Sequence, residues 1–226
     1  VGHVFHYKPT VRALVDLMKS GELGKIHYID SIRVNLGLFR SDVNVLWDLA
    51  PHDLSIFEAI LNKMPKRVHA IGACHVPHPT TPQETMSYLT LDYGDGCLGH
   101  IHVNWFSPLK QRLMVIAGSK KMAVYDDASL GEPLRVYDRG TYDPVADTPL
   151  YPTMRTGDTL IPFLKMDEPL QLQLKEFFAS IEEGRPPQTD GCAGLRIIQI
   201  LEAANRSLKT GAFVDVASEE DVHVET

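Results

Sequence analysis

The pattern of apolar and polar positions along the chain predicts a mixture of helices and strands. Apolar residues recur every three or four positions where a helix is expected, and they alternate with polar residues where a strand is expected. The expected helices cover residues 9–21, a stretch that begins after residue 45, residues 168–183 and residues 190–210. The expected strands cover residues 1–5, 25–36, 66–76, 85–93, 97–105, 112–118, 121–126, 134–137 and 213–216.

The order of these elements predicts an α+β fold. Several expected strands follow one another from residue 85 to residue 137 with short connections, which favours an antiparallel meander. Asp95 and Gly96 are typical of a hairpin turn between the first two of them. Residues 140–164 are rich in Pro, Thr and Asp and are expected to form a long loop. The expected fold class is a broad, mostly antiparallel open sheet with helices packed on one face.

Composition and charge are those of an ordinary globular protein. The 226 residues are 44% hydrophobic and 23% charged, and residues 1–217 are expected to form one domain, followed by an acidic tail at 218–226. The net charge is −7 without a basic cluster, so neither nucleic acid nor an anionic membrane is an expected partner. No apolar run approaches the roughly 20 residues that span a bilayer, and the opening residues do not resemble a signal peptide. The three widely spaced cysteines favour a reducing, cytoplasmic setting.

Residues 41–60 carry the pair of side chains with the clearest chemical interpretation. Asp48 and His52 are four residues apart near the start of an apolar-periodic run, and such positions share one face of a helix. Pro51 is expected to lie in the first turn, where its missing N–H has no partner to lose. A carboxylate beside an imidazole can support proton transfer. The alternative is that Asp48 only caps the helix and that His52 is a half-buried structural histidine.

Other polar residues are candidates for substrate binding. Lys110 and Arg112 alternate at the start of an expected strand, where they would bind an anionic group of a substrate or else form a solvated strand edge. Tyr7 precedes the first helix, and Arg40 and Asn44 precede the helix that carries Asp48. These three are added to the candidate substrate-binding residues.

Two further motifs have a structural interpretation. Residues 94–99 match the pattern G-x-G-x-x-G, but the alternating segment that follows predicts a strand, whereas a dinucleotide-binding loop leads into a helix. His100 and His102 share one face of an expected strand and could form half of a zinc site, but the sequence supplies no convincing further ligands. We therefore expect no cofactor-binding loop and no metal site, and keep a metal-dependent hydrolase that uses the two histidines as a minor alternative.

Four blocks of the sequence resemble the C-terminal domain of the Gfo/Idh/MocA oxidoreductases. They are VGHVFHYKPTVRALVDLMKSGELGKIHYIDSIR, VLWDLAPHDLSI, MVIAGSKKMAVYDD and EPLQLQLKEFFASIEEGRPPQTDGCAGLRIIQILEAANRSLKTGAFVDV. The blocks occur in the family's order and cover the chain to about residue 216. The resemblance implies a sheet domain like those of dihydrodipicolinate reductase and the C-terminal half of glyceraldehyde-3-phosphate dehydrogenase. The segment GDTLIPFLKMDEPL is similar to members that act on nucleotide-linked sugars.

The resemblance implies that this chain is the substrate-binding part of a two-domain enzyme. In the family, an N-terminal Rossmann domain binds NAD or NADP, and the C-terminal domain supplies the substrate floor and the oligomer interface. His52 would be the acid/base in hydride transfer at a hydroxyl of a sugar, inositol or nucleotide-sugar, and Asp48 would be its partner.

The chain also departs from the family pattern. The glycine-rich loop and the E-K-P segment of the family are missing, so this chain alone is not expected to bind NAD tightly or to turn over. A homodimer or homotetramer through the sheet face is expected. The alternative is a non-enzymatic binding or assembly module that retains the fold.

Overall fold

The helices begin and end at residues that can cap them. The structure, a computed structural model, describes residues 1–76, 83–141 and 154–217. The helices are the 3₁₀ helix η1 (Val4–Tyr7) and the α-helices α1 (Pro9–Lys19), α2 (Val45–Leu61), α3 (Pro169–Glu183) and α4 (Gly191–Thr210). The side chain of Asn44 accepts a hydrogen bond from the backbone N–H of Trp47 at the start of α2, and Asp190 caps α4 in the same way. Gly211 ends α4 in the left-handed conformation, with φ of +67°.

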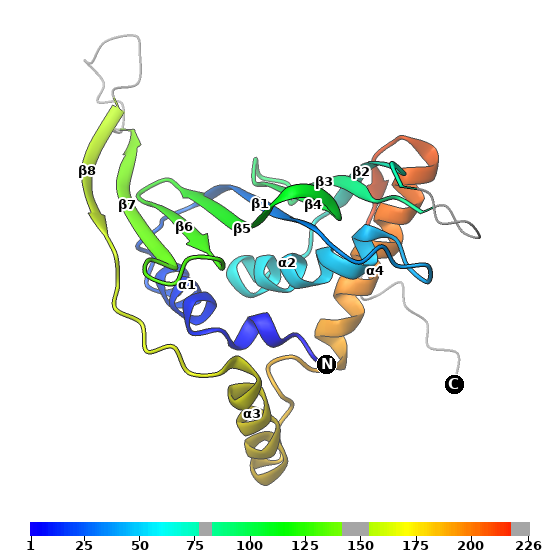
Figure 1. Cartoon of the computed structure of the whole chain (residues 1–226). Helices are drawn as coiled ribbons and strands as arrows, with labels where there is room; N and C mark the ends of the chain where they lie inside the picture. The colour runs from blue at the N-terminus through cyan, green and yellow to red at the C-terminus, as the bar shows by residue number, and fades with distance from the viewer. Residues whose placement is uncertain (77–82, 142–153, 218–226) are drawn as a thin grey trace.

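The strands form one open sheet, and α1, α2 and α4 lie against one face of it (Figure 1). The strands are β1 (Ile26–Leu36), β2 (Arg67–Ala73), β3 (Met86–Asp92), β4 (Leu98–Asn104), β5 (Phe106–Gly118), β6 (Met122–Asp126), β7 (Leu134–Thr141), β8 (Met154–Leu160) and β9 (Val214–Asp215). Their order is β8-β7-β6-β5-β1-β4-β3-β2-β9. Every neighbouring pair is antiparallel except β1 with β4, which is parallel. The expected α+β class, with a mostly antiparallel open sheet and helices on one face, is confirmed.

Strand β1 lies at the centre of the sheet because it pairs along both of its edges. Ser31 of β1 is opposite Ile101 of β4 on one side and opposite Met114 of β5 on the other. Strands β4 and β5 follow each other in the sequence but do not pair, so the expected simple meander is wrong at this point. The insertion of a strand from much earlier in the chain depends on long-range pairing, for which local spacing gives no signal.

Two other expected elements differ from the structure. The expected strand at residues 1–5 is replaced by η1, which turns both Phe5 and Tyr7 into the interior. Strand β8 lies inside the expected loop at 140–164, since its largely exposed residues carry no apolar alternation and it is held by backbone pairing with β7. The rest of that loop, the proline-containing loop at 77–82 and the tail at 218–226 lie outside the described residues.

Helix α2 is fixed on the sheet by its apolar side. Phe57 of α2 is fully buried, and a Cβ atom at Gly99 of β4 would lie 2.9 Å from its ring, so the absence of a side chain there allows the close approach. The helix begins at Val45, earlier than expected, and Pro51 therefore lies inside it rather than in its first turn. Asp48 and His52 of α2 are only partly buried, and the candidate site lies around them, whereas Asp53 is buried against β1.

Candidate functional site

Asp48 lies in the first turn of α2 and is held by two donors from other elements. The indole Nε1–H of Trp105 donates a hydrogen bond of 2.9 Å to its Oδ2 atom. The guanidinium of Arg40 lies 3.5 Å from its Oδ1 atom and also pairs with Asp42. The Asp48 side chain is 26% exposed, so it is partly desolvated yet still open on one side. The contacts fix the direction of the carboxylate independently of the helix itself.

His52 lies one turn further along the same side of α2. Its ring packs against Phe5 of η1, with 4.8 Å between ring centroids and an interplanar angle of 47°. Within the described part of the chain, neither ring nitrogen makes a hydrogen bond, and no hydrogen bond joins His52 to Asp48. Burial, followed by the positive charge of Arg33, lowers the pKa of His52 from 6.5 to about 4. The imidazole is therefore neutral at pH 7 and can accept a proton.

A buried ion pair lies beneath His52. Arg33 of β1 donates hydrogen bonds of 2.7 and 3.0 Å to the two carboxylate oxygens of Asp53, the residue that follows His52 in α2. The hydroxyl of Ser31 donates a third bond of 3.0 Å to the same carboxylate. The guanidinium of Arg33 also lies 4.6 Å from the centroid of the Phe5 ring that packs on His52. This pair fixes α2 to β1 and brings a fixed positive charge close to the imidazole.

A second polar cluster continues from Phe5 along the same side of the sheet. The amine of Lys8 lies 4.7 Å from the Phe5 centroid and forms an ion pair with Asp127, which follows β6. The hydroxyl of Tyr125 donates a bond of 2.8 Å to Asp127, and Arg112 of β5 lies 3.4 Å from it. Burial raises the pKa of Asp127, but the hydrogen bonds from Lys8 and Tyr125 outweigh it and the net shift is downward. The cluster therefore holds one carboxylate between two cations.

The structure brings together only some of the substrate-binding candidates. Arg40 lies beside Asp48, and the charge of Arg112 acts on His52. Tyr7 instead points to the loop before α4, where its hydroxyl lies 2.9 Å from Oγ1 of Thr189. Asn44 caps α2 and donates a bond to Glu84, and Lys110 is exposed on β5.

Several residues of the site were not found from the sequence. They are Phe5, Lys8, Arg33, Asp53, Trp105, Tyr125 and Asp127. Each reaches the site from an element distant in sequence from α2, apart from Asp53. A charged residue in the middle of an alternating strand, as at Arg33, is the one local signal that could have indicated a buried partner.

A hollow of about 730 Å³ lies farther along α2, between η1, α1 and α4. Its lining includes His3, His6, Arg12, Glu58, Gln188 and Arg196. Neither Asp48 nor His52 lines it. Burial is the main cause that lowers the pKa of both histidines in the lining. Arg196 in this lining is paired with Glu58, and the mixed polar and apolar lining does not indicate a particular ligand.

The opposite, outer face of the sheet carries the two histidines that the sequence singled out. The ring of Tyr88 stacks between them, with centroid distances of 4.3 Å to His102 and 5.9 Å to His100. No group of three His, Cys, Asp or Glu side chains in the described ranges is arranged to hold a metal ion. The metal-dependent hydrolase therefore has no support in the described residues.

The G-x-G-x-x-G match at residues 94–99 does not have the surroundings of a dinucleotide-binding loop. It covers the hairpin turn between β3 and β4 and the first two residues of β4; in the turn Asp95 and Gly96 have positive φ and Tyr93 donates its backbone N–H to the carbonyl of Cys97. Strand β4 follows directly, so no helix N-terminus faces this turn. Separately, no helix among the described residues is long and apolar enough to cross a membrane.

The family model for the GFO/IDH/MocA C-terminal domain matches residues 11–124, which is half of the chain. The chain belongs to the GFO/IDH/MocA family. A curated relative, UDP-N-acetylglucosamine 3-dehydrogenase of Acidithiobacillus ferrooxidans, is 25% identical over 199 residues, which are 88% of this chain and 58% of the relative. The chain thus spans less than two thirds of that relative's length.

Solved structures show the same fold. The structure of the Acidithiobacillus ferrooxidans dehydrogenase superposes with a TM-score of 0.70 at 23% identity, over 92% of this chain and 63% of that one. Levoglucosan dehydrogenase in complex with NADH and L-sorbose gives a TM-score of 0.76 at 17% identity, over 96% and 65%. The first of these structures is named as a dehydrogenase of UDP-N-acetylglucosamine and the second contains NADH and L-sorbose, and this chain corresponds to a part of each.

Proposed function

We propose that this chain is the substrate-binding part of an NAD(P)-dependent oxidoreductase that acts on a hydroxyl of a sugar, inositol or nucleotide-sugar. The observation that supports the proposal most strongly is the neutral, half-buried imidazole of His52, one helical turn from the fixed carboxylate of Asp48, in a chain of this family. The similarity to UDP-N-acetylglucosamine 3-dehydrogenase favours a nucleotide-sugar within that class.

The chemistry assigned to this chain is the movement of one proton. When a secondary alcohol is oxidised, the O–H bond breaks as the hydride leaves the neighbouring carbon, and His52 accepts the proton. NAD(P), when bound by another part of the enzyme, supplies the hydride acceptor. The carboxylates of Asp53 and Asp48 then favour the imidazolium, whereas the charges of Arg33 and Arg112 oppose it. This balance makes His52 ready to return the proton when the reaction runs in reverse.

The residues around His52 provide polar contacts for a polyhydroxylated substrate. Arg40 is about half exposed beside Asp48, and Arg112 is 41% exposed beside Asp127. Both can donate several hydrogen bonds to hydroxyl, carboxylate or phosphate oxygens. We assign them to substrate binding, and place Tyr7, Asn44 and the buried Arg33 in support of the local fold.

We also propose that the protein acts in the cytoplasm as a homodimer or homotetramer. Tyr88, His100, His102 and Ile71 belong to strands whose outer face is not covered by any helix of the described chain (Figure 1). Ile71 is 62% exposed there. Covering this face with a second subunit would bury apolar and aromatic surface.

An activity assay of the enzyme that contains this chain and its NAD(P)-binding domain tests the proposed function. Reduction of NAD⁺ and NADP⁺ is followed with a panel of UDP-sugars, free aldoses and inositol. We expect turnover with at least one of these classes, and a loss of about 10²–10⁴-fold for His52→Ala with unchanged cofactor affinity. Lys209→Ala, at the exposed C-terminal end of α4, is the control and should keep full activity. Unchanged turnover of His52→Ala would remove this residue from the mechanism.

A further inference from the structure

Helix α3 packs on the rest of the chain by its polar side and turns its apolar side to solvent. The more buried positions include Gln173, Glu176 and Ser180, which share one side of the helix. The opposite side carries the α3 stripe, five large apolar side chains that are each 49–63% exposed: Leu170, Leu174, Phe177, Phe178 and Ile181. A surface helix ordinarily has the reverse arrangement, since burial of the apolar side is what holds it to the core. The α3 stripe is therefore a surface that lacks its partner among the described residues.

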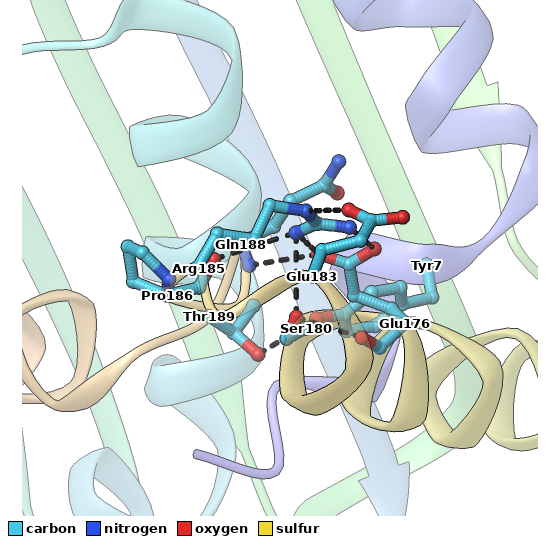
Figure 2. Close-up of polar contacts among 8 residues, drawn as sticks. All are labelled: Tyr7, Glu176, Ser180, Glu183, Arg185, Pro186, Gln188 and Thr189. Atoms are coloured by element: carbon cyan, nitrogen blue, oxygen red, sulfur yellow. Dashed lines mark hydrogen bonds and ion pairs between the residues drawn. The ribbon is translucent and has the colours of Figure 1, made fainter.

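The helix is nevertheless held in a fixed position (Figure 2). The guanidinium of Arg185, just after α3, donates bonds of 2.7 and 3.1 Å to the two carboxylate oxygens of Glu176 and one of 3.3 Å to Oγ of Ser180. The backbone N–H of Gln188 donates to the same Glu176 carboxylate at 3.2 Å. This network fixes α3 to the loop that leads into α4. The α3 stripe is thus presented in a preformed orientation, which reduces the entropy lost when a partner binds.

The α3 stripe lies on the side of the molecule where His52 is found. η1 contacts both α2 and α3, and Phe5 of η1 packs directly on the His52 ring. Figure 1 shows the order from the sheet through α2 and η1 to α3. Five side chains at about half exposure present on the order of 400 Å² of apolar surface, which is the size of a functional patch on a monomer.

We infer that the α3 stripe is the docking surface for the NAD(P)-binding domain of the same enzyme; the inference rests on the proposed function. A hydride passes between atoms that are roughly 3–3.5 Å apart, so the domain that carries the nicotinamide has to cover the helix side of this chain at His52. The G-x-G-x-x-G match lies between two strands rather than before a helix, and the NADH complex of levoglucosan dehydrogenase is matched over 65% of its chain. An apolar surface on the side of His52 therefore fits that domain, whereas the outer sheet face lies away from it.

Hydrogen exchange of residues 169–183 tests this inference. It is measured in the enzyme that contains this chain and its NAD(P)-binding domain, and in the 226-residue chain alone. We expect the α3 amides to exchange at least tenfold more slowly in the enzyme. The pair of substitutions Leu174→Glu and Phe178→Glu should remove that protection and separate the thermal unfolding of the two domains. Leu130→Glu, a fully exposed apolar residue in the turn between β6 and β7, is the control that should leave both unchanged.

Three results would overturn the inference. One is equal exchange of α3 in the enzyme and in the chain alone. A gene in which no NAD(P)-binding domain is joined to this chain counts as the same result. The second is protection of α3 in the isolated chain that rises with its concentration, which would assign the stripe to a second copy. The third is protection in the isolated chain that is lost when residues 218–226 are deleted. Hydrogen exchange does not depend on turnover, so the docking surface and the proposed function can fail separately. If His52→Ala abolishes activity but α3 is unprotected, the docking surface is refuted and the proposed function stands.

Discussion

Replacement of Asp53 by Asn is expected to destabilise the chain strongly, because it leaves a buried charge without its partner. The side chains of Arg33 and Asp53 are only 5% and 4% exposed, and two hydrogen bonds join them. Removal of one member of a buried pair typically costs about 3–5 kcal/mol. The amide keeps the shape and one acceptor for Ser31, so we expect a loss of about 3 kcal/mol in the free energy of unfolding.

Urea denaturation at pH 7, followed by tryptophan fluorescence and circular dichroism, measures this loss. Asp95→Asn is the matched control: its carboxylate pairs with Lys63 on the surface at 3.3 Å, and little change is expected because exposed pairs contribute little. The double variant Arg33→Met and Asp53→Leu should recover most of the stability lost in Asp53→Asn, since it removes both buried charges. A loss below about 1 kcal/mol for Asp53→Asn would refute the assignment of a buried, dry ion pair.

Three further predictions concern the site, the sheet and the assembly. Trp105→Phe removes the donor to Asp48, and we expect kcat of the full enzyme to fall several-fold while cofactor affinity is unchanged; unaltered kinetics would show that Asp48 needs no fixed direction. Gly118→Ala would place a Cβ atom 2.0 Å from the carbonyl oxygen of Leu23, so a loss of about 2–3 kcal/mol in urea denaturation is expected, and an unchanged midpoint would contradict the packing. Light scattering at micromolar concentration should show a dimer or tetramer that Tyr88→Glu dissociates, and a monomeric parent chain would contradict the sheet-face interface.

The sequence was most informative where a local pattern decides the structure. Pro9 and Gly21 bracket α1, and the alternation of residues 25–36 gave β1 nearly to the residue, because spacing alone indicates which side is buried. The i, i+4 relation likewise placed Asp48 and His52 on one side of α2. The start of α2 was misjudged because Asn44, rather than Asp48, provides the cap.

The features that were missed depend on contacts between distant segments. The parallel pairing of β1 with β4 joins strands that are about seventy residues apart, and β8 is an edge strand without apolar alternation. On the apolar stripe of α4, Leu195 and Ile198 are 39% and 40% exposed, whereas Leu201 and Ala204 are buried. An amphipathic pattern predicts an apolar face and does not identify which partner covers it.

The low pKa of His52 also predicts how acid affects the fold. The imidazole takes up its proton near pH 6.5 in the unfolded chain and near pH 4 in the folded chain. The unfolded state therefore binds more protons between these values, and His52 contributes a loss of stability as the pH falls from about 6.5 to about 4, up to about 3 kcal/mol. Above pH 6.5 this contribution is constant.

An NMR titration of the His52 ring in the purified 226-residue chain, with assignment by His52→Gln, tests the central claim most directly. The account predicts that this ring stays neutral through pH 6 and takes up its proton near pH 4, as a desolvated base beside Arg33 must. A ring that titrates at pH 6.5 or above would contradict it, since His52 would then be a solvated histidine rather than the buried proton acceptor of this site.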